Sequence, residues 1–139
     1  MQKVLLEDIM CDHPIKVTDD VRLGAVAHLL LRHRINGILV VKKEDQNKLV
    51  GILTTTDLLR ILDHVFSNGK QKIKELKRIS DLPVSQFASK NVICLTKSTK
   101  IVKAIAIMHK KKVHTLPVYD NGKLVGVVGR HDILNIALS

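Results

Sequence analysis

Two segments of the chain place a glycine, a polar or small residue and an aspartate at the same spacing. Residues 51–57 read GILTTTD and residues 126–132 read GVVGRHD. A glycine lets another group approach the backbone closely, and a threonine hydroxyl beside the free N–H groups of a helix start can hold a phosphate. An aspartate can accept both hydroxyls of a ribose through charge-assisted hydrogen bonds, each ~1.5–3 kcal/mol. The alternative is that Thr54 and Asp57 only cap a helix, but the repetition favours a binding site.

The two segments belong to a longer internal repeat. Residues 48–59 resemble residues 123–134, which lie 75 positions later, and residues 15–18 recur 78 positions later. The difference of three falls within residues 42–47, which the second copy shortens to residues 120–122. Length variation confined to a turn between two strands is typical of a true repeat.

Hydrophobic periodicity predicts the elements that position these segments. In each copy a short strand precedes an amphipathic helix, and two β-rich runs and a final helix follow, so the order is β-α-β-β-α twice. Residues 120–122 (DNG) are typical of a hairpin turn, and an aspartate suits the first turn of a final helix opening at Asp57 or Asp132. The fold class is therefore α/β (α+β). The expected strands are 15–17, 38–41 and 49–53, then 92–95, 116–119 and 124–128, and the apolar helix faces are Leu23, Val26, Ala27, Leu30 and Leu31, then Ile101, Ala104, Ile105 and Met108.

Length and composition narrow the class of protein. The chain has 139 residues, 45% hydrophobic and 26% charged, which fits one ordinary domain or two half-size units. No apolar run approaches the ~18–20 residues of a membrane span, and Glu7 and Asp8 come too early for a signal peptide. Two cysteines make no disulfide framework. We therefore expect a cytoplasmic protein that does not associate with a membrane.

Metal binding and catalysis are not expected from the residue pattern. The histidines and cysteines show no zinc-type spacing, and His28 and His33 lie off a common helical face. Cys94 falls in a predicted buried strand, where a small apolar role is expected rather than reactivity. No serine or cysteine has the local setting of a nucleophile with an oriented base. The sequence therefore predicts no metal site, no catalytic residue and no cofactor.

The net charge of +10 and the pI of about 9.8 favour an anionic partner, although a solvated Lys-rich surface explains the same charge. Nucleic acid is the alternative partner, because basic residues cluster between and within the copies. One Tyr, two Phe and no Trp leave almost no platform for base stacking, so sequence-specific reading is not expected. The basic residues concerned are Lys70, Lys72, Lys74, Lys77, Arg78, Lys97, Lys100, Lys103 and Lys110–Lys112.

These motifs resemble those of a tandem pair of cystathionine-β-synthase (CBS) domains, often called a Bateman module. The resemblance rests on residues 8–10 (DIM), residues 113–118 (VHTLPV) and the two repeated segments, 51–57 and 126–132. It covers nearly the whole chain. It implies a first CBS repeat at residues 1–66, a basic linker with one short helix at residues 67–81 and a second repeat at residues 82–139.

The resemblance also implies a ligand and its contacts. Two CBS repeats are expected to pack about a pseudo-two-fold axis and leave two clefts, each able to hold AMP, ADP, ATP or S-adenosylmethionine. The aspartate of one repeat holds the ribose, while the first strand and pre-proline segment of the other enclose the adenine. One cleft would use Gly51, Ile52, Thr54, Thr56 and Asp57 facing Thr96, Val113, His114 and Thr115, and the other Gly126, Val127, Arg130, His131 and Asp132 facing Thr18, Ile35, Asn36 and Gly37.

Two positions depart from the family pattern. Gly129 stands where the motif has Ser or Thr, so the second site lacks that hydroxyl. Leu39 stands where the second copy has Pro117, which alters the expected adenine wall. The candidates for phosphate contacts are His114, Arg130 and His131, of which Arg130 keeps its charge and offers a fork of donors; the alternative is that all three are surface side chains.

The function predicted from these features is regulatory. An adenosine ligand that bridges the repeats would stabilise one arrangement, and a separate effector protein would read the change. Because the chain ends at Ser139, just beyond the last motif helix, we expect a stand-alone, non-catalytic module. Its helices after each motif are expected to form a homodimer through Leu58, Leu59, Ile61, Leu62, Ile133, Leu134, Ile136 and Leu138.

Overall fold

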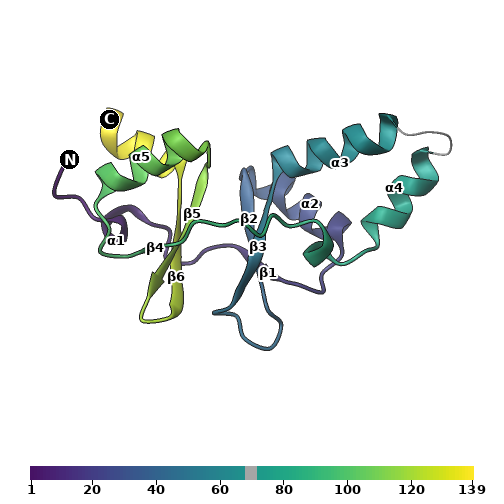
Figure 1. Ribbon diagram of the computed structural model, residues 1–139, viewed down its shortest axis with the longest axis horizontal. Helices are drawn as coiled ribbons and strands as arrows, with labels where there is room; N and C mark the ends of the chain where they lie inside the picture. Colours follow the sequence, from purple (N-terminus) through teal and green to yellow (C-terminus); the bar gives the residue numbers. More distant parts are fainter. Residues whose placement is uncertain (68–71) are drawn as a thin grey trace. The chain divides into compact units, whose positions relative to one another are not determined.

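The chain forms two compact units that divide it unevenly. The computed structural model describes residues 1–67 and 72–139. One unit, here the contiguous unit, is Ile15–Asn91. The other, here the composite unit, joins Met1–Pro14 to Val92–Ser139, so that purple N-terminal residues and green to yellow C-terminal ones belong together in Figure 1.

The contiguous unit is a three-stranded mixed sheet with its helices to one side (Figure 1). The strand order is β1-β2-β3, in which β1 runs parallel and β3 antiparallel to the central β2. A parallel pair needs a crossover connection, and α2 supplies it. The bounds are β1 Lys16–Thr18, α2 Leu23–His33, β2 Gly37–Val41, β3 Leu49–Thr54, α3 Thr55–Ser67, α4 Lys72–Ser80 and the 3-10 helix η1 Val84–Gln86.

The core of the contiguous unit follows the predicted periodicity of α2, with one exception. Leu23, Val26 and Leu30 are buried in one cluster with apolar residues of the sheet and of α4. Leu31, expected on the same face, is 70% exposed. It lines an open apolar groove of about 440 Å³ that α2 forms with α3 and α4. The face of α2 that was predicted to be buried therefore includes one residue, Leu31, that is not buried.

The composite unit repeats the same plan, with strand order β4-β5-β6. Leu6, from the start of the chain, is fully buried in a cluster with Leu116, Val128 and Ile133. The Leu6 N–H also donates to the Thr99 carbonyl, at 2.9 Å. The bounds are α1 Leu6–Ile9, β4 Leu95–Thr96, α5 Ile101–Lys111, β5 Thr115–Asp120, β6 Lys123–Gly129 and α6 Arg130–Leu138.

The predicted order β-α-β-β-α is confirmed in both copies, and a short helix, α4, lies within residues 67–81, where one was expected; it packs in the core of the contiguous unit through Ile79. The hairpin at residues 120–122 is confirmed by the positive φ of Asn121 (50°) and Gly122 (77°). The final helices begin at Thr55 and Arg130, two residues before the aspartates at which they were predicted to begin. Each aspartate lies inside the first turn and accepts a hydrogen bond from the backbone N–H of the residue before the helix.

Three further expectations about single residues are wrong. Cys94 is exposed and lies outside the short strand β4, so it is not a buried strand residue. Ile133 is buried in the core of its own unit rather than offered to a partner. Ile105, expected on the apolar face of α5, is exposed. Lys70 lies outside the described residues.

Equivalent helices of the two units end in the same unusual way. The residues after α2 and α5 are Arg34 and Lys112, and both have φ 53° and ψ 42°, in the left-handed region. This conformation closes the helix, since each N–H bonds back to a carbonyl of the last turn. Glycine usually takes this position because a Cβ is disfavoured there.

Among the described residues, none of the helices combines the length and the apolar content that a membrane span needs.

Candidate functional site

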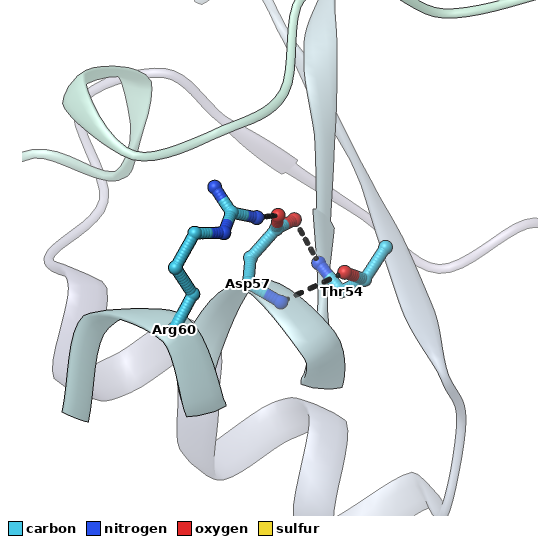
Figure 2. Close-up of polar contacts among 3 residues, drawn as sticks. All are labelled: Thr54, Asp57 and Arg60. Carbon is cyan, nitrogen blue, oxygen red and sulfur yellow. Dashed lines mark hydrogen bonds and ion pairs between the residues drawn. The ribbon is translucent and has the colours of Figure 1, made fainter. Parts of the chain in front are cut away.

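The repeated motif of the contiguous unit forms a reciprocal cap at the junction of β3 and α3. The Thr54 N–H donates to Asp57 Oδ2 at 2.8 Å, and the Asp57 N–H donates to Thr54 Oγ1 at 3.1 Å (Figure 2). The residue Asp57 is only 4% exposed. A buried carboxylate needs such partners because its desolvation is costly. The helix-cap role considered from the sequence is therefore present, and it uses one of the two carboxylate oxygens.

The other oxygen of Asp57 has a partner that the motif does not contain. Arg60, one helical turn further along α3, donates from its guanidinium to Asp57 Oδ1. In Figure 2 the Arg60 side chain and the Thr54 backbone N–H reach the carboxylate from opposite sides. The spacing of three residues on a helix brings such side chains together, so this pair was open to prediction from the sequence.

The motif of the composite unit has the same cap with fewer partners. The Gly129 N–H donates to Asp132 Oδ2 at 2.7 Å, which matches the bond at Asp57. Gly129 has no hydroxyl to accept from the Asp132 N–H, as the sequence indicated. Asp132 is half-buried, and Asn135 stands at the position equivalent to Arg60. The strand–helix junctions at Asp57 and Asp132, here the motif ends, thus share the backbone hydrogen bond to the aspartate but differ in charge, because only the first has an arginine beside it.

Each motif end lies beside the pre-strand segment of its own unit. The Thr55 N–H donates to the Asn36 carbonyl at 2.9 Å, and the Arg130 N–H donates to the His114 carbonyl at 3.0 Å. Of the side chains, Asn36 is half-buried, and His114 and Arg130 are exposed. The structure therefore brings together, within each unit, residues that the family resemblance assigned to different sites. Strand pairing places Gly37 opposite Thr54 and Thr115 opposite Gly129.

The motif glycines allow a close approach, but the group that approaches is the chain's own backbone. A Cβ on Gly51 would lie 2.4 Å from the Ser89 carbonyl oxygen. A Cβ on Gly126 would lie 2.7 Å from Met10 Sδ and 2.8 Å from the Cys11 carbonyl oxygen. The sequence analysis predicted a close approach at these glycines but attributed it to a ligand. The approaching segments, at Ser89 and at Met10 and Cys11, are far from the glycines along the chain, so no local pattern indicated them.

The residues that follow these glycines are occupied by the same crossing segments. Ile52 exchanges backbone hydrogen bonds with Ser89, and Val127 does so with Cys11. Their N–H and C=O groups are therefore satisfied within the protein. Ile52 is also buried, and its expected ligand contact stays a prediction.

The threonines of the first strands hold local hydroxyl networks. Thr18 Oγ1 donates to Asp20 Oδ1 at 2.6 Å, and Lys43 Nζ lies 3.3 Å from Asp20 Oδ2. The Thr18 hydroxyl and the Lys43 ammonium hold the pKa of Asp20 below its usual value. The hydroxyl of Thr96 lies 3.3 Å from that of Ser98. The sequence identified the threonines but not Asp20.

The remaining predicted site residues divide into apolar and exposed ones. Ile35 and Val113 are half-buried and pack against the cores of their own units. Thr56 and His131 are exposed in the first turns of α3 and α6. Beside the capped aspartates, the first turn of each helix thus presents exposed polar side chains at the positive end of the helix dipole, which favours an anion.

Comparison with known proteins places the whole chain in one family. The CBS domain family matches residues 6–64 and 79–139. The chain is 29% identical over 127 residues to inosine-5'-monophosphate dehydrogenase of Staphylococcus epidermidis, covering 91% of this chain but only 23% of the dehydrogenase.

Two solved structures share the fold. The CBS domain pair of MJ0100, in complex with 5-methylthioadenosine and S-adenosyl-L-methionine, has a TM-score of 0.72 and 25% identity, covering 96% of this chain and 94% of that one. CBSX2 in complex with AMP has a TM-score of 0.76 and 23% identity, covering 96% of each chain. The repeated motif ends, the two matched segments and the shared architecture lead to one conclusion: the chain belongs to the CBS domain family and carries two CBS domains in tandem.

Proposed function

We propose that this CBS pair is a non-catalytic regulatory module that binds an adenosine-containing ligand at its two motif ends. The observation that carries the proposal is the shared geometry at Asp57 and Asp132. Each carboxylate has one oxygen fixed by the N–H of the strand end three residues before, at 2.8 and 2.7 Å. The second oxygen is thereby oriented before a ligand arrives, which lowers the cost of ordering on binding, although at Asp57 this oxygen also accepts the Arg60 guanidinium.

A ribose is the chemical group that fits this oriented carboxylate. Its neighbouring hydroxyls are two donors that one carboxylate can accept, and each charge-assisted bond contributes about 1.5–3 kcal/mol. The helix starts at Thr55 and Arg130 favour an anion on the same ligand. The ligand class is therefore an adenine nucleotide (AMP, ADP or ATP) or S-adenosylmethionine, whose anionic group is its carboxylate.

The solved neighbours support the adenosine part of this proposal. MJ0100 was solved with two adenosine compounds, S-adenosyl-L-methionine and 5-methylthioadenosine, and CBSX2 with AMP. The assignments of the adenine wall, including Thr18, Thr96 and Thr115, stay predictions from the family resemblance.

Regulation follows from differential binding. A ligand that binds one arrangement of the protein more tightly shifts the population toward it, and an effector protein can read that shift. The homodimer belongs to the same proposal. Exposed apolar side chains on α3 and α6 supply the surface for it, with Leu59 68% and Leu138 80% exposed.

Isothermal titration calorimetry tests the proposal. AMP, ADP, ATP, S-adenosylmethionine and 5-methylthioadenosine are titrated into the wild type, Asp57→Asn, Asp132→Asn and the double variant. Asparagine keeps an oxygen for the cap but loses the charge, so each single variant should lose one class of sites, with about tenfold to hundredfold weaker binding. Asp63→Asn removes an exposed charge from the same helix and is the matched control. 2'-Deoxy-AMP, which lacks the diol, should bind as weakly to the wild type as AMP binds to the variants.

Two results would contradict the proposal. One is the absence of any heat or thermal shift with adenosine compounds at millimolar concentration. The other is a lower melting temperature for Asp57→Asn with unchanged affinity, which would leave the aspartate as a helix cap only. Tight retention of duplex or single-stranded nucleic acid in a gel-shift titration at physiological salt would favour the alternative partner.

A further inference from the structure

The carboxylate that is proposed to hold a ribose at the first motif is already engaged on both oxygens. Asp57 Oδ2 accepts the Thr54 N–H, and Asp57 Oδ1 accepts the Arg60 guanidinium (Figure 2). The Asp57 side chain is 6% exposed while that of Arg60 is 67% exposed. The anion is therefore held in place, and the cation covers it from the solvent side.

The second motif lacks this cover. Asn135 stands at the position of Arg60, and it is neutral. Asp132 Oδ2 accepts the Gly129 N–H in the same way as its counterpart. The chain thus contains a natural pair of sites that share the capped aspartate and differ by one charge beside it.

We infer that Arg60 is a specificity-determining residue that competes with the ribose for Asp57; this rests on the proposed function. A diol can reach Asp57 Oδ1 only when the guanidinium leaves it, so neutral adenosine must displace a charge-assisted bond. The Arg60 side chain is mostly solvent-exposed, so its release buries no charge.

The displaced guanidinium stays on α3, one turn from the bound sugar, and this sets the ligand class. A positive charge there favours a ligand with a phosphate and disfavours a cationic sulfonium. The Asp57 site is therefore selective for nucleotides such as AMP over adenosine and S-adenosylmethionine, whereas the Asp132 site discriminates less on this ground.

The test isolates the Asp57 site in an Asp132→Asn background and compares Arg60 with Arg60→Gln. Glutamine keeps the helix propensity and removes the charge. Because the Arg60 guanidinium is mostly exposed to solvent, we take its pair with Asp57 to contribute about 1 kcal/mol, so adenosine should bind about threefold to fivefold more tightly to Arg60→Gln. The ratio of AMP affinity to adenosine affinity should fall in the same variant. Arg60→Lys keeps the charge and should retain most of the AMP preference.

The chain offers a matched control for charge and spacing. Arg78 pairs with Glu75 at 2.6 Å on α4, also three residues apart and in the same unit. Arg78→Gln removes the same charge and should leave both affinities unchanged. The reciprocal variant, Asn135→Arg in an Asp57→Asn background, should weaken adenosine binding at the second motif about threefold and raise its AMP preference. Circular dichroism melts of each variant check that folding is kept.

The outcomes separate this inference from the proposed function. Unchanged or weaker adenosine binding in Arg60→Gln, with binding still lost in Asp57→Asn, would overturn the competitor role and leave the binding function intact. An unchanged ratio of AMP to adenosine affinity would overturn the selectivity. Absence of adenosine and AMP binding in every variant and in the wild type would overturn both.

Discussion

Ile52 and Ser89 exchange both of their backbone hydrogen bonds, with N···O distances of 3.0 and 2.8 Å. Val127 and Cys11 do the same in the other unit, at 3.0 and 2.9 Å. In each unit a segment distant in sequence therefore crosses the outer edge of the motif strand. A bare strand edge invites pairing with other chains, so this crossing also protects β3 and β6.

Gly51→Ala should destabilise the contiguous unit, because the added Cβ meets a carbonyl oxygen of the crossing segment at 2.4 Å. Backbone cannot rotate away as a side chain does, so the free energy of unfolding should fall by about 1–3 kcal/mol in urea titrations. Gly129→Ala is the control, since its Cβ would meet nothing nearer than 3.6 Å. Equal stability of Gly51→Ala and the wild type would refute the steric role of the crossing.

Gly129→Thr should stabilise the composite unit. Gly129 has φ −100° and ψ 165°, which any residue adopts, and a hydroxyl there can accept the Asp132 N–H as Thr54 Oγ1 accepts that of Asp57. Because glycine is itself a tolerable cap residue, the gain expected from the added hydroxyl is roughly a few tenths of a kcal/mol, measurable as a higher Tm in calorimetry. Gly129→Val adds the same shape without the hydroxyl, so an equal gain in that variant would show that capping is not the cause.

Arg34→Gly and Lys112→Gly should each raise the free energy of unfolding by about 0.5–1 kcal/mol. Both residues have φ 53°, and this conformation costs a residue with a Cβ about 1–2 kcal/mol. Glycine avoids that cost, but its greater conformational freedom in the unfolded chain offsets about half of the gain. Ala106→Gly, at an exposed position inside α5, is the opposite control and should lose about 1 kcal/mol. Loss of stability in all three variants would contradict the account of these helix ends.

Alkylation of Cys94 should require a higher pH in the folded protein than in the unfolded one. Although the Cys94 residue is exposed, neighbouring atoms partly desolvate its sulfur and raise the pKa of the thiol, and the thiolate is the reactive form. In a Cys11→Ser variant, the rate with iodoacetamide should therefore rise with pH to a midpoint above that measured in urea. Coincident midpoints in the folded and unfolded protein would count against this shift.

The fold was predictable from the sequence wherever the determinants are local. The order of elements within each copy, the buried positions Leu23, Val26 and Leu30 of α2 and the turn at residues 120–122 each follow from short-range geometry, and the structure confirms them. The predictions failed where burial depends on distant segments. Leu31 faces a groove made with α3 and α4, and the regular part of β4 is only two residues long, which leaves Cys94 outside it.

The candidate site was predictable in its residue types and less so in its partners. Asp57 and Thr54 were identified from one motif because a cap and a ligand site need the same atoms. Arg60 was not predicted, because the repeated segments end at Asp57 and Asp132 and Asn135 takes the equivalent position in the second copy, although a spacing of three on a helix brings such side chains together. The contacts at Gly51 were beyond sequence analysis, since no local pattern names the segment that crosses it.

The division of the chain has a consequence for its synthesis. Residues 15–91 lie in one stretch, so a nascent chain can complete that unit soon after it leaves the ribosome. Leu6 and its neighbours emerge first but must wait until Ile133 and the rest of their core have been translated. During that interval Leu6 has no core to pack into, and because its contact with Ile133 has high sequence separation, we expect that contact to form late.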